Sequence, residues 1–552
     1  MRKDGKVTKL NFSDDFLLDC AENKYQAGDY FGALRLIEQR NERYAPSADA
    51  FALAADVYEA LELYPMCADC WFRFLDTCNE ADFAEGYEGL AVSFMNMGDA
   101  VQAAIFYRLS LDDGEFPEAV ELDPEDFLRD EPKLRLVRSD SEEGEYSVAR
   151  GVNLMKTGDL KGARETFLSV PENCADRASA AGLAAMCLLL TGDEEGAERE
   201  CAELYGKYPE NVQTLTTYCA VLGARGNKEG AEKIAKELSR IPVTATEDMY
   251  RVSTALCETG LHEEAYALLT RLKEKAMRYD ENVLWFHAVA ARNTGRLDEA
   301  ISSLERLTDL YPRKAVAKYY LEKLRAMRDG EGEIEMRYYY RLPPDEYRAV
   351  ADFFLDLEKS DGKSADVDLF SRNFRLAFDE MEGRDTKLQL LAAKEAAAFS
   401  ADNLLREVLL DYNEEEIVKI SIIHDLTVRG EEDSFGTVIC NRYKEFFTHR
   451  LEIGSRKHEA FMKAFADVYS KFVLIEDGNG SLNEDKLCDA AEDVYDSLSE
   501  AGALGYADRR AEISAAIYRE ARLLDGVRGL EEIVKLFDAD KAVTEEILNF
   551  LI

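Results

Sequence analysis

The sequence predicts an all-α protein, organised mainly as a solenoid of stacked helical hairpins. Between residues 144 and 312 a glycine recurs at spacings of 34, 34, 34 and 35 residues, and an alanine follows each glycine five residues later. A period this strict is typical of repeat architectures. The glycines are Gly158, Gly192, Gly226, Gly260 and Gly295, and the alanines are Ala163, Ala197, Ala231, Ala265 and Ala300.

A single unit of this pattern has the features of two helices joined by a tight turn. In the third unit Leu215, Cys219 and Leu222 form one apolar stripe at helical spacing. Gly226 ends this helix, because glycine adopts the left-handed conformation that stops a helix. Ala231 lies on the second helix, where a small residue lets two helices cross closely. One hairpin cannot bury its own apolar stripes, so we expect the units to stack.

The short motifs at the turns resemble those of the tetratricopeptide repeat (TPR) family. Residues 158–163 read Gly-Asp-Leu-x-x-Ala, residues 192–197 Gly-Asp-Glu-x-x-Ala and residues 295–300 Gly-Arg-Leu-x-x-Ala. Tyr-Pro follows at 208–209 and at 311–312. The resemblance implies a TPR-type right-handed solenoid, whose first helices line a concave groove that binds a peptide or helix of a partner protein.

The N-terminal part of the chain carries looser copies of the same unit. After a polar tail over residues 1–13, we predict three degenerate TPR-like units over residues 14–112, with Glu62 in the place of one glycine. An acidic linker over residues 113–143 follows, interrupted by prolines. This linker has two interpretations, an acidic docking segment or a spacer between two repeat arrays.

The remaining chain is also predicted to be helical. Residues 144–328 form the regular array with a capping helix at its end. Residues 334–450 lose the period and are predicted as a helical, HEAT-like domain. Within them residues 435–448 are rich in β-branched and aromatic side chains, which predicts either a small hairpin or one more buried helix. Residues 456–552 are predicted as a C-terminal helical bundle.

A second, shorter resemblance lies near the C-terminus. The stretches 514–523, 530–537 and 543–548 are similar to the closing helices of the cyclin-like core of transcription factor B, and to a helix-turn-helix. Glu545 and Glu546 occupy the helix that would enter a DNA groove. A helix in that position lies close to DNA phosphates, whose negative charge would repel the two glutamates. We therefore expect DNA binding to be absent.

The composition limits the classes of partner. The chain holds 110 acidic and 68 basic residues, for a net charge of −42, which disfavours nucleic acid and anionic lipid. This charge has two interpretations, recruitment of a basic protein or a solvated helix surface. There is no apolar run of about 18 residues and no secretory signal, so we expect a cytoplasmic chain without a membrane partner. The 11 cysteines are expected to be buried free thiols.

The sequence contains no pattern that predicts catalysis, a metal or a cofactor. No two of the five histidines have metal-binding helical spacing, and no phosphate-binding or nucleotide-binding glycine loop occurs. We therefore predict a non-catalytic adaptor or scaffold. The alternatives are a transcription-associated regulator with a cyclin-like or helix-turn-helix C-terminal domain, and an enzyme of unrecognised type within residues 334–552.

The binding surface predicted for the adaptor is the inner face of the first helices. Its mixture of apolar and aromatic residues with few charges is typical of a protein interface. For Trp285 the alternative is packing between neighbouring units. The predicted groove residues are Met186, Leu189, Gln213, Thr216, Tyr250, Thr254, Glu258, Asn282, Trp285, Val289 and Arg292.

Overall fold

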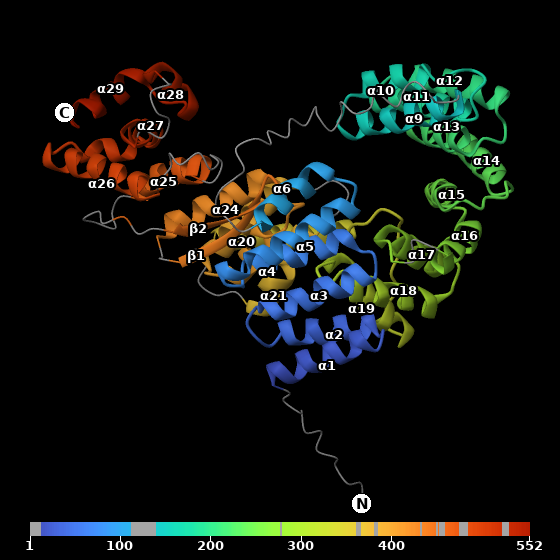
Figure 1. Cartoon of the computed structure of the whole chain (residues 1–552), viewed down its shortest axis with the longest axis horizontal. Helices are drawn as coiled ribbons and strands as arrows, with labels where there is room; N and C mark the ends of the chain where they lie inside the picture. Colours follow the sequence, from blue (N-terminus) through green and yellow to red (C-terminus); the bar gives the residue numbers. More distant parts are fainter. Residues whose placement is uncertain are drawn as a thin grey trace, which may run out of the picture. The chain divides into compact units, whose positions relative to one another are not determined.

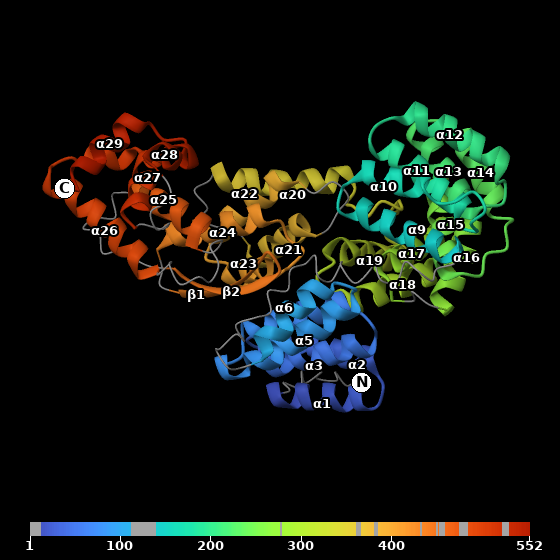
Figure 2. The same ribbon diagram turned by 45° about the horizontal axis from the view of Figure 1, so that its top comes forward.

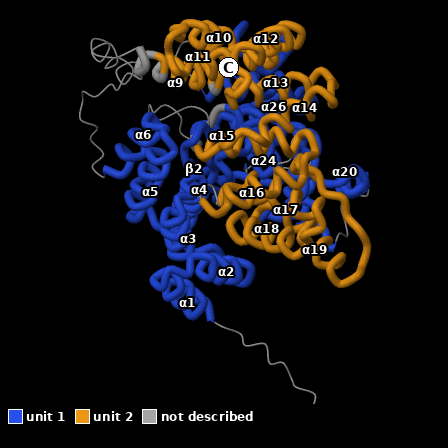
Figure 3. Tube along the Cα trace, turned by 90° about the vertical axis from the view of Figure 1, so that its right-hand side faces the viewer, with its two compact units in different colours: residues 1–112, 342–552 blue, residues 113–341 orange. Residues whose placement is uncertain are grey.

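The chain divides into two compact units (Figure 3). Unit 1 comprises residues 1–112 and 342–552, and unit 2 comprises residues 113–341. The computed structural model describes residues 13–111, 140–275, 279–359, 366–379, 385–430, 433–448, 451, 459–473, 484–521 and 529–551. The tail at 1–12 and most of the predicted acidic linker, residues 113–139, lie outside the described residues.

Unit 2 is a run of helical hairpins that follow one another from α9 to α19 (Figures 1 and 2). Each hairpin consists of a first and a second helix, and α19 follows the last hairpin. The sequence predicted this solenoid, and the structure confirms it. The helices are α9 (Asp140–Lys156), α10 (Leu160–Leu168), α11 (Arg177–Leu190), α12 (Glu194–Lys207), α13 (Val212–Ala224), α14 (Lys228–Leu238), α15 (Thr246–Glu258), α16 (His262–Lys275), α17 (Glu281–Asn293), α18 (Leu297–Leu310) and α19 (Ala315–Arg328).

The repeated turn between the two helices of a hairpin follows from two residues. Gly226 adopts φ +73°, a left-handed conformation that ends α13, and the repeat glycines at 158, 192, 260 and 295 do the same. The next residue, Asn227, caps α14 by accepting a hydrogen bond from the amide of Gly230. Asp159 and Asp193 cap α10 and α12 in the same way. In these hairpins, the 34-residue period thus repeats a glycine that ends one helix and an N-cap residue that begins the next.

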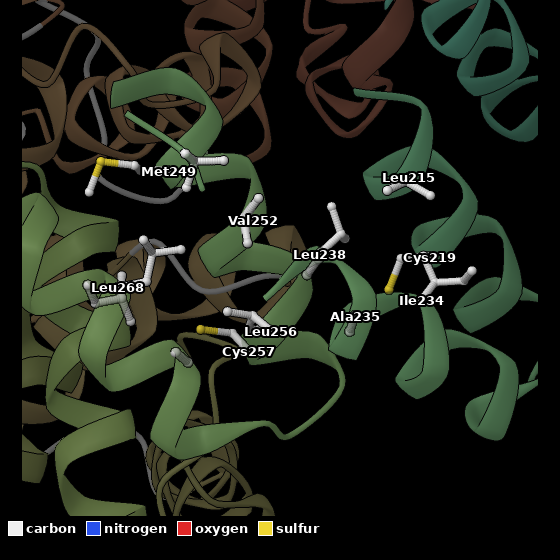
Figure 4. Packing of buried hydrophobic residues seen from close by; sticks show 14 of the residues in the cluster. Leu215, Cys219, Ile234, Ala235, Leu238, Met249, Val252, Leu256, Cys257 and Leu268 are labelled. Atoms are coloured by element: carbon white, nitrogen blue, oxygen red, sulfur yellow. The ribbon is translucent and has the colours of Figure 1, made fainter. Parts of the chain in front are cut away.

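The apolar stripes of adjacent hairpins merge into a continuous core (Figure 4). One cluster joins Leu215 and Cys219 of α13 with Leu238 of α14 and Leu256 of α15, all of which are buried. Ala231 lies in the same cluster, at the crossing of α13 and α14. No single hairpin could enclose this set, so stacking stabilises each unit through its neighbours.

The N-terminal part of unit 1 contains three further hairpins. Glu62 adopts φ +59° at the second turn, so it takes the conformation that glycine has in the other units. Asp29 and Asp99 cap the second helices of the first and third hairpins. The helices are α1 (Asp14–Gln26), α2 (Tyr30–Asn41), α3 (Ala48–Ala60), α4 (Tyr64–Leu75), α5 (Phe83–Asn96) and α6 (Ala100–Ser110), with the 3₁₀ turn η1 (Glu80–Asp82) before α5.

The C-terminal part of unit 1 is helical apart from one antiparallel hairpin. Strands β1 (Asp433–Ile439) and β2 (Arg442–Thr448) pair with Phe435 opposite Phe446. The two-residue turn, Cys440 and Asn441, has positive φ at both positions, as a tight hairpin requires. Of the two predictions for this stretch, the hairpin is confirmed.

Helices flank this hairpin on both sides in the sequence. Before it come α20 (Pro344–Lys359), α21 (Val367–Phe378), α22 (Thr386–Ala398), α23 (Asp402–Leu409) and α24 (Glu416–Arg429). After it come α25 (Glu459–Val468), the π-helical turn η3 (Tyr469–Val473), α26 (Glu484–Glu500), the 3₁₀ turn η4 (Leu504–Asp508), α27 (Arg510–Glu520), α28 (Leu530–Phe537) and α29 (Lys541–Asn549). None of the described helices is long and apolar enough to cross a membrane.

The two parts of unit 1 are joined by specific contacts that the sequence did not predict. Asp76, at the C-terminal end of α4, accepts a hydrogen bond of 2.9 Å from the amide of Gly436 on β1. The ring of Tyr412 packs between Phe72 of α4 and Phe94 of α5. The N-terminal hairpins therefore share a core with residues that follow more than 300 positions later in the chain.

Candidate functional site

The first helices of unit 2 define one side of the solenoid. Successive first helices contact each other, α11 with α13 and α13 with α15, whereas the second helices contact the next first helix. This arrangement places the first helices on a shared surface. We call the surface formed by α11, α13, α15, α17 and α19 the first-helix face.

The predicted site residues of α11 and α13 lie half-buried. Met186 and Leu189 of α11 keep part of their surface in solvent, and Leu190 beside them is 55% exposed. Thr216 donates a hydrogen bond to the carbonyl oxygen of Gln213, and the Gln213 amide bonds to a hydroxyl of its own helix. In the structure, this part of the face is apolar on α11 and neutral polar on α13.

The predicted residues of α15 and α17 have different surroundings. Tyr250 and Thr254 of α15 are half-buried and Glu258 is exposed. On α17, Asn282 is exposed and Arg292 is half-buried, but Trp285 and Val289 are fully buried. The sequence set therefore contains open positions and covered ones, and whether any of them contacts a partner stays a prediction.

The cover over Trp285 comes from the chain itself. After α19 the chain turns at Gly330 and Gly332, both with positive φ, and residues 334–341 continue outside helix and strand, with bends at 338, 339 and 341. We call residues 334–341 the returning segment. Its side chains alternate strictly, with the even-numbered positions buried or half-buried and the odd-numbered positions exposed. Alternation of this kind indicates that one side of the segment is packed on a surface.

Three side chains of unit 2 bind the backbone of the returning segment. The indole N–H of Trp285 donates to the carbonyl oxygen of Tyr338 at 2.9 Å. The Asn293 amide donates to the carbonyl of Met336 at 3.5 Å, and the Tyr320 hydroxyl donates to the carbonyl of Arg341 at 3.1 Å. Three donors on α17 and α19 thus satisfy three main-chain acceptors, which is how proteins commonly hold an extended peptide.

The first tyrosine of the returning segment inserts between α15, α16 and α17. The Tyr338 ring stacks on His262 and meets Phe286 edge-on, with ring centroids 5.7 and 6.0 Å apart. Its hydroxyl lies 2.9 Å from Nδ1 of His262. Burial raises the pKa of Tyr338, and burial also raises the pKa of the neighbouring Cys257 thiol.

The second inward tyrosine packs against α17 and α19. The Tyr340 ring meets Trp285 edge-on at 4.9 Å, and its hydroxyl accepts a hydrogen bond from the amide of Ala317 at 3.1 Å. The ammonium of Lys314 lies 5.4 Å from the centre of the same ring. Tyr339, between the two inward tyrosines, points outward and is 53% exposed. The face therefore distinguishes the inward positions from the outward ones.

Sequence reasoning missed the returning segment because it ended the repeat array at residue 328 and began the next domain at residue 334. A usable signal was present, since Ile334, Met336, Tyr338 and Tyr340 alternate with Glu335, Arg337, Tyr339 and Arg341. A period of two predicts an extended segment with one buried side. It does not predict which surface buries that side.

A buried polar cluster lies beneath the face, between α16, α17 and α18. Nδ1 of His287 lies 2.9 Å from the Ser303 hydroxyl, and the Lys273 ammonium donates to the same hydroxyl at 2.9 Å. Burial and the nearby Lys273 charge lower the pKa of His287 to about 3. His287 and Ser303 are fully buried, so they satisfy one another in the core and do not meet solvent.

The remaining described residues offer few other candidates for chemistry. No group of three or more His, Cys, Asp or Glu side chains within the described ranges could hold a metal ion. Cys67 and Cys70, the pair with CxxC spacing, are buried and form no disulfide within the described residues, and burial raises the pKa of Cys67 to about 11. At the C-terminus, Glu545 and Glu546 are exposed on α29.

A sequence profile of the family described as tetratricopeptide repeat matches residues 287–314. No curated protein matches the chain significantly. Similar solved structures include a thermophilic TPR protein of Thermus thermophilus, with 16% identity and a TM-score of 0.26, covering 33% of this chain and 98% of that one.

Two further similar structures also contain tetratricopeptide repeats and also have low identity to this chain. One is a tetratricopeptide repeat protein of Parabacteroides merdae, with 15% identity and a TM-score of 0.26, covering 51% of this chain and 98% of that one. The other is the TPR2AB domain of yeast Sti1 in complex with pHSP90, with 13% identity and a TM-score of 0.18, covering 47% of this chain and 96% of that one.

These structural likenesses are weak, so classification depends on the profile match and on the repeat itself. Stacked hairpins with a 34-residue period and a left-handed glycine at each turn define a helical-repeat protein. Within that class, the profile match over α17 and α18 identifies residues 287–314 as a tetratricopeptide repeat, as the sequence motifs predicted.

Proposed function

We propose that this protein is a non-catalytic adaptor that binds an extended segment of a partner protein on its first-helix face. The observation that carries the proposal is the returning segment, which already occupies part of that face without forming a helix or a strand. Its carbonyl groups accept hydrogen bonds from Trp285, Asn293 and Tyr320. The returning segment therefore supports peptide binding as the mode by which the rest of this face contacts a partner.

The part of the face on α11 and α13 is the proposed docking site for the partner. Met186 and Leu189 are half-buried and Leu190 is largely exposed, so apolar surface remains available there. Gln213 and Thr216 add neutral polar groups on the adjacent helix. Apolar anchors beside neutral hydrogen-bonding groups suit a peptide with apolar side chains and suit a charged one poorly.

The chemistry of the cysteines supports a location for this activity. The described cysteines are free, and most of them are buried. Free thiols persist in reducing compartments, so we propose that the adaptor acts in the cytoplasm.

The alternative functions have less support. A transcription-associated regulator that contacts DNA through α29 would place the exposed Glu545 and Glu546 against phosphates, which is electrostatically unfavourable. An enzyme within residues 334–552 would need a cluster of reactive groups in a cleft, and no observation favours such a site.

The test places a photoreactive amino acid at two positions in the full chain. Thr216 lies on the first-helix face, whereas Lys236 is exposed on the second helix α14. We expect crosslinking in cells to give one defined protein from position 216 and none from position 236. Met186→Glu should abolish the crosslink, because it places a charge among the apolar contacts. Equal crosslinking from both positions, or a crosslink that Met186→Glu leaves unchanged, would contradict the proposal.

A further inference from the structure

We propose that the first-helix face on α15, α17 and α19 is a second peptide-binding site, which the returning segment occupies as a built-in competitor. Its external ligand is an extended peptide of a partner, with large apolar or aromatic side chains at alternate positions and a Tyr-x-Tyr pair at its centre. The inference depends on the proposed function only in taking the first-helix face as the binding surface.

The chemistry of the ligand is read from the occupant. Met336 is buried and Tyr338 and Tyr340 are half-buried, whereas Arg337 and Tyr339 between them are exposed. A partner peptide that makes the same contacts needs the inward side chains and is free at the outward positions. This alternation separates the ligand from a helix, whose inward positions would recur every three or four residues.

The face recognises two features of the occupant. Trp285, Asn293 and Tyr320 donate to carbonyl oxygens, which every peptide carries. The aromatic surroundings of the two tyrosines are specific to ring side chains, with His262 and Phe286 around Tyr338. The hydroxyl contacts of the two tyrosines, with Nδ1 of His262 and the amide of Ala317, favour tyrosine over phenylalanine. Main-chain bonds supply affinity and the rings supply selectivity.

The connection to α19 makes the occupant a competitor. The returning segment follows α19 after a turn that contains Gly330 and Gly332, so it is tethered a few residues from its own site. A short tether gives an effective concentration of about 1 mM. A free peptide whose intrinsic Kd is on the order of 100 µM would then bind the intact chain roughly tenfold more weakly than a chain with the site open.

The experiment measures the binding of a fluorescein-labelled peptide with the sequence of residues 332–342 to the full chain by anisotropy. The site is opened by Tyr338→Ala with Tyr340→Ala, and the matched control is Tyr339→Ala, an outward tyrosine in the same segment. We expect the opened variant to bind the peptide roughly tenfold more tightly than the wild type and the control, which should be equal. A peptide with serine at both inward tyrosines should not bind.

A milder variant covers the case in which the double substitution disturbs folding. Tyr338→Phe keeps the ring packing and removes only the hydroxyl contact with His262, so we expect binding between that of the wild type and the opened variant. Equal peptide binding by the wild type, Tyr338→Phe and Tyr339→Ala would overturn the inference, as would equal binding of the serine peptide. Either result would leave the crosslink at position 216 unaffected, so the two proposals fail separately.

Discussion

A pair of glycine-to-alanine substitutions, three residues apart, tests whether backbone conformation sets the repeat. Gly226 has φ +73° at the hairpin turn, whereas Gly223 lies within helix α13. Beyond its chain neighbours and the backbone of its own helix, a Cβ atom at either position would meet no atom within 4 Å, so neither substitution creates a clash. Any difference between the two variants therefore reports conformation and not packing.

The expected effects have opposite signs. An L-residue in the left-handed region costs about 1–2 kcal/mol, and the lower entropy of the unfolded chain returns part of it, so Gly226→Ala should destabilise by roughly 1 kcal/mol. Alanine is a better helix former than glycine by about 0.5–1 kcal/mol, and Gly223 lies near the helix end, so Gly223→Ala should stabilise by roughly 0.5 kcal/mol.

The assay is urea unfolding of the full chain followed by the fluorescence of Trp285. The chain holds two tryptophans, and Trp71→Phe removes the other one, which lies in unit 1. With a slope of about 2 kcal/mol per molar urea, the midpoint should fall by roughly 0.5 M for Gly226→Ala and rise by roughly 0.25 M for Gly223→Ala. Shifts in the same direction for both variants would refute the reasoning.

Three further predictions concern unit 2 and the cysteines. Ala231→Trp should destabilise unit 2 by about 1–3 kcal/mol, because it overpacks a close helix crossing. The exposed control Lys236→Ala should change stability by less than about 0.5 kcal/mol. Equal denaturation midpoints for the two variants would contradict the assigned helix faces. His287 has a pKa lowered to about 3, so the unfolded chain takes up its proton near pH 6.5 first, and acidification from pH 6.5 towards 3 should cost about 1.4 kcal/mol per pH unit. Between pH 7 and pH 5, the unfolding midpoint of His287→Gln should therefore fall less than that of the wild type. Cys440 is exposed, whereas burial raises the pKa of the Cys201 thiol to about 12. Cys440→Ser should therefore remove the fastest phase of thiol labelling at pH 8. If that phase persists in the variant, another cysteine is the most reactive one.

The sequence by itself determined the hairpins, because their signals are local. A glycine that tolerates positive φ, followed by an Asp or Asn cap, acts within a few residues of backbone. Glu62 shows how far this logic extends, since its turn forms in the same conformation without the glycine. The β-hairpin was one of two predictions for residues 435–448, and their composition favoured a buried helix equally.

Only the tertiary structure decided which part of the first-helix face stays open. Trp285 was predicted as a groove residue, and the returning segment covers it through a contact 53 positions along the chain. The contact of Asp76 with Gly436 spans 360 positions. A period of two in the sequence predicts that one side of a segment is buried, but it does not predict which surface buries it. Likewise, a carboxylate at a helix end does not reveal which distant group donates a hydrogen bond to it. Pairings of this kind depend on the free energy of the whole folded chain, because no local backbone preference distinguishes one distant partner from another.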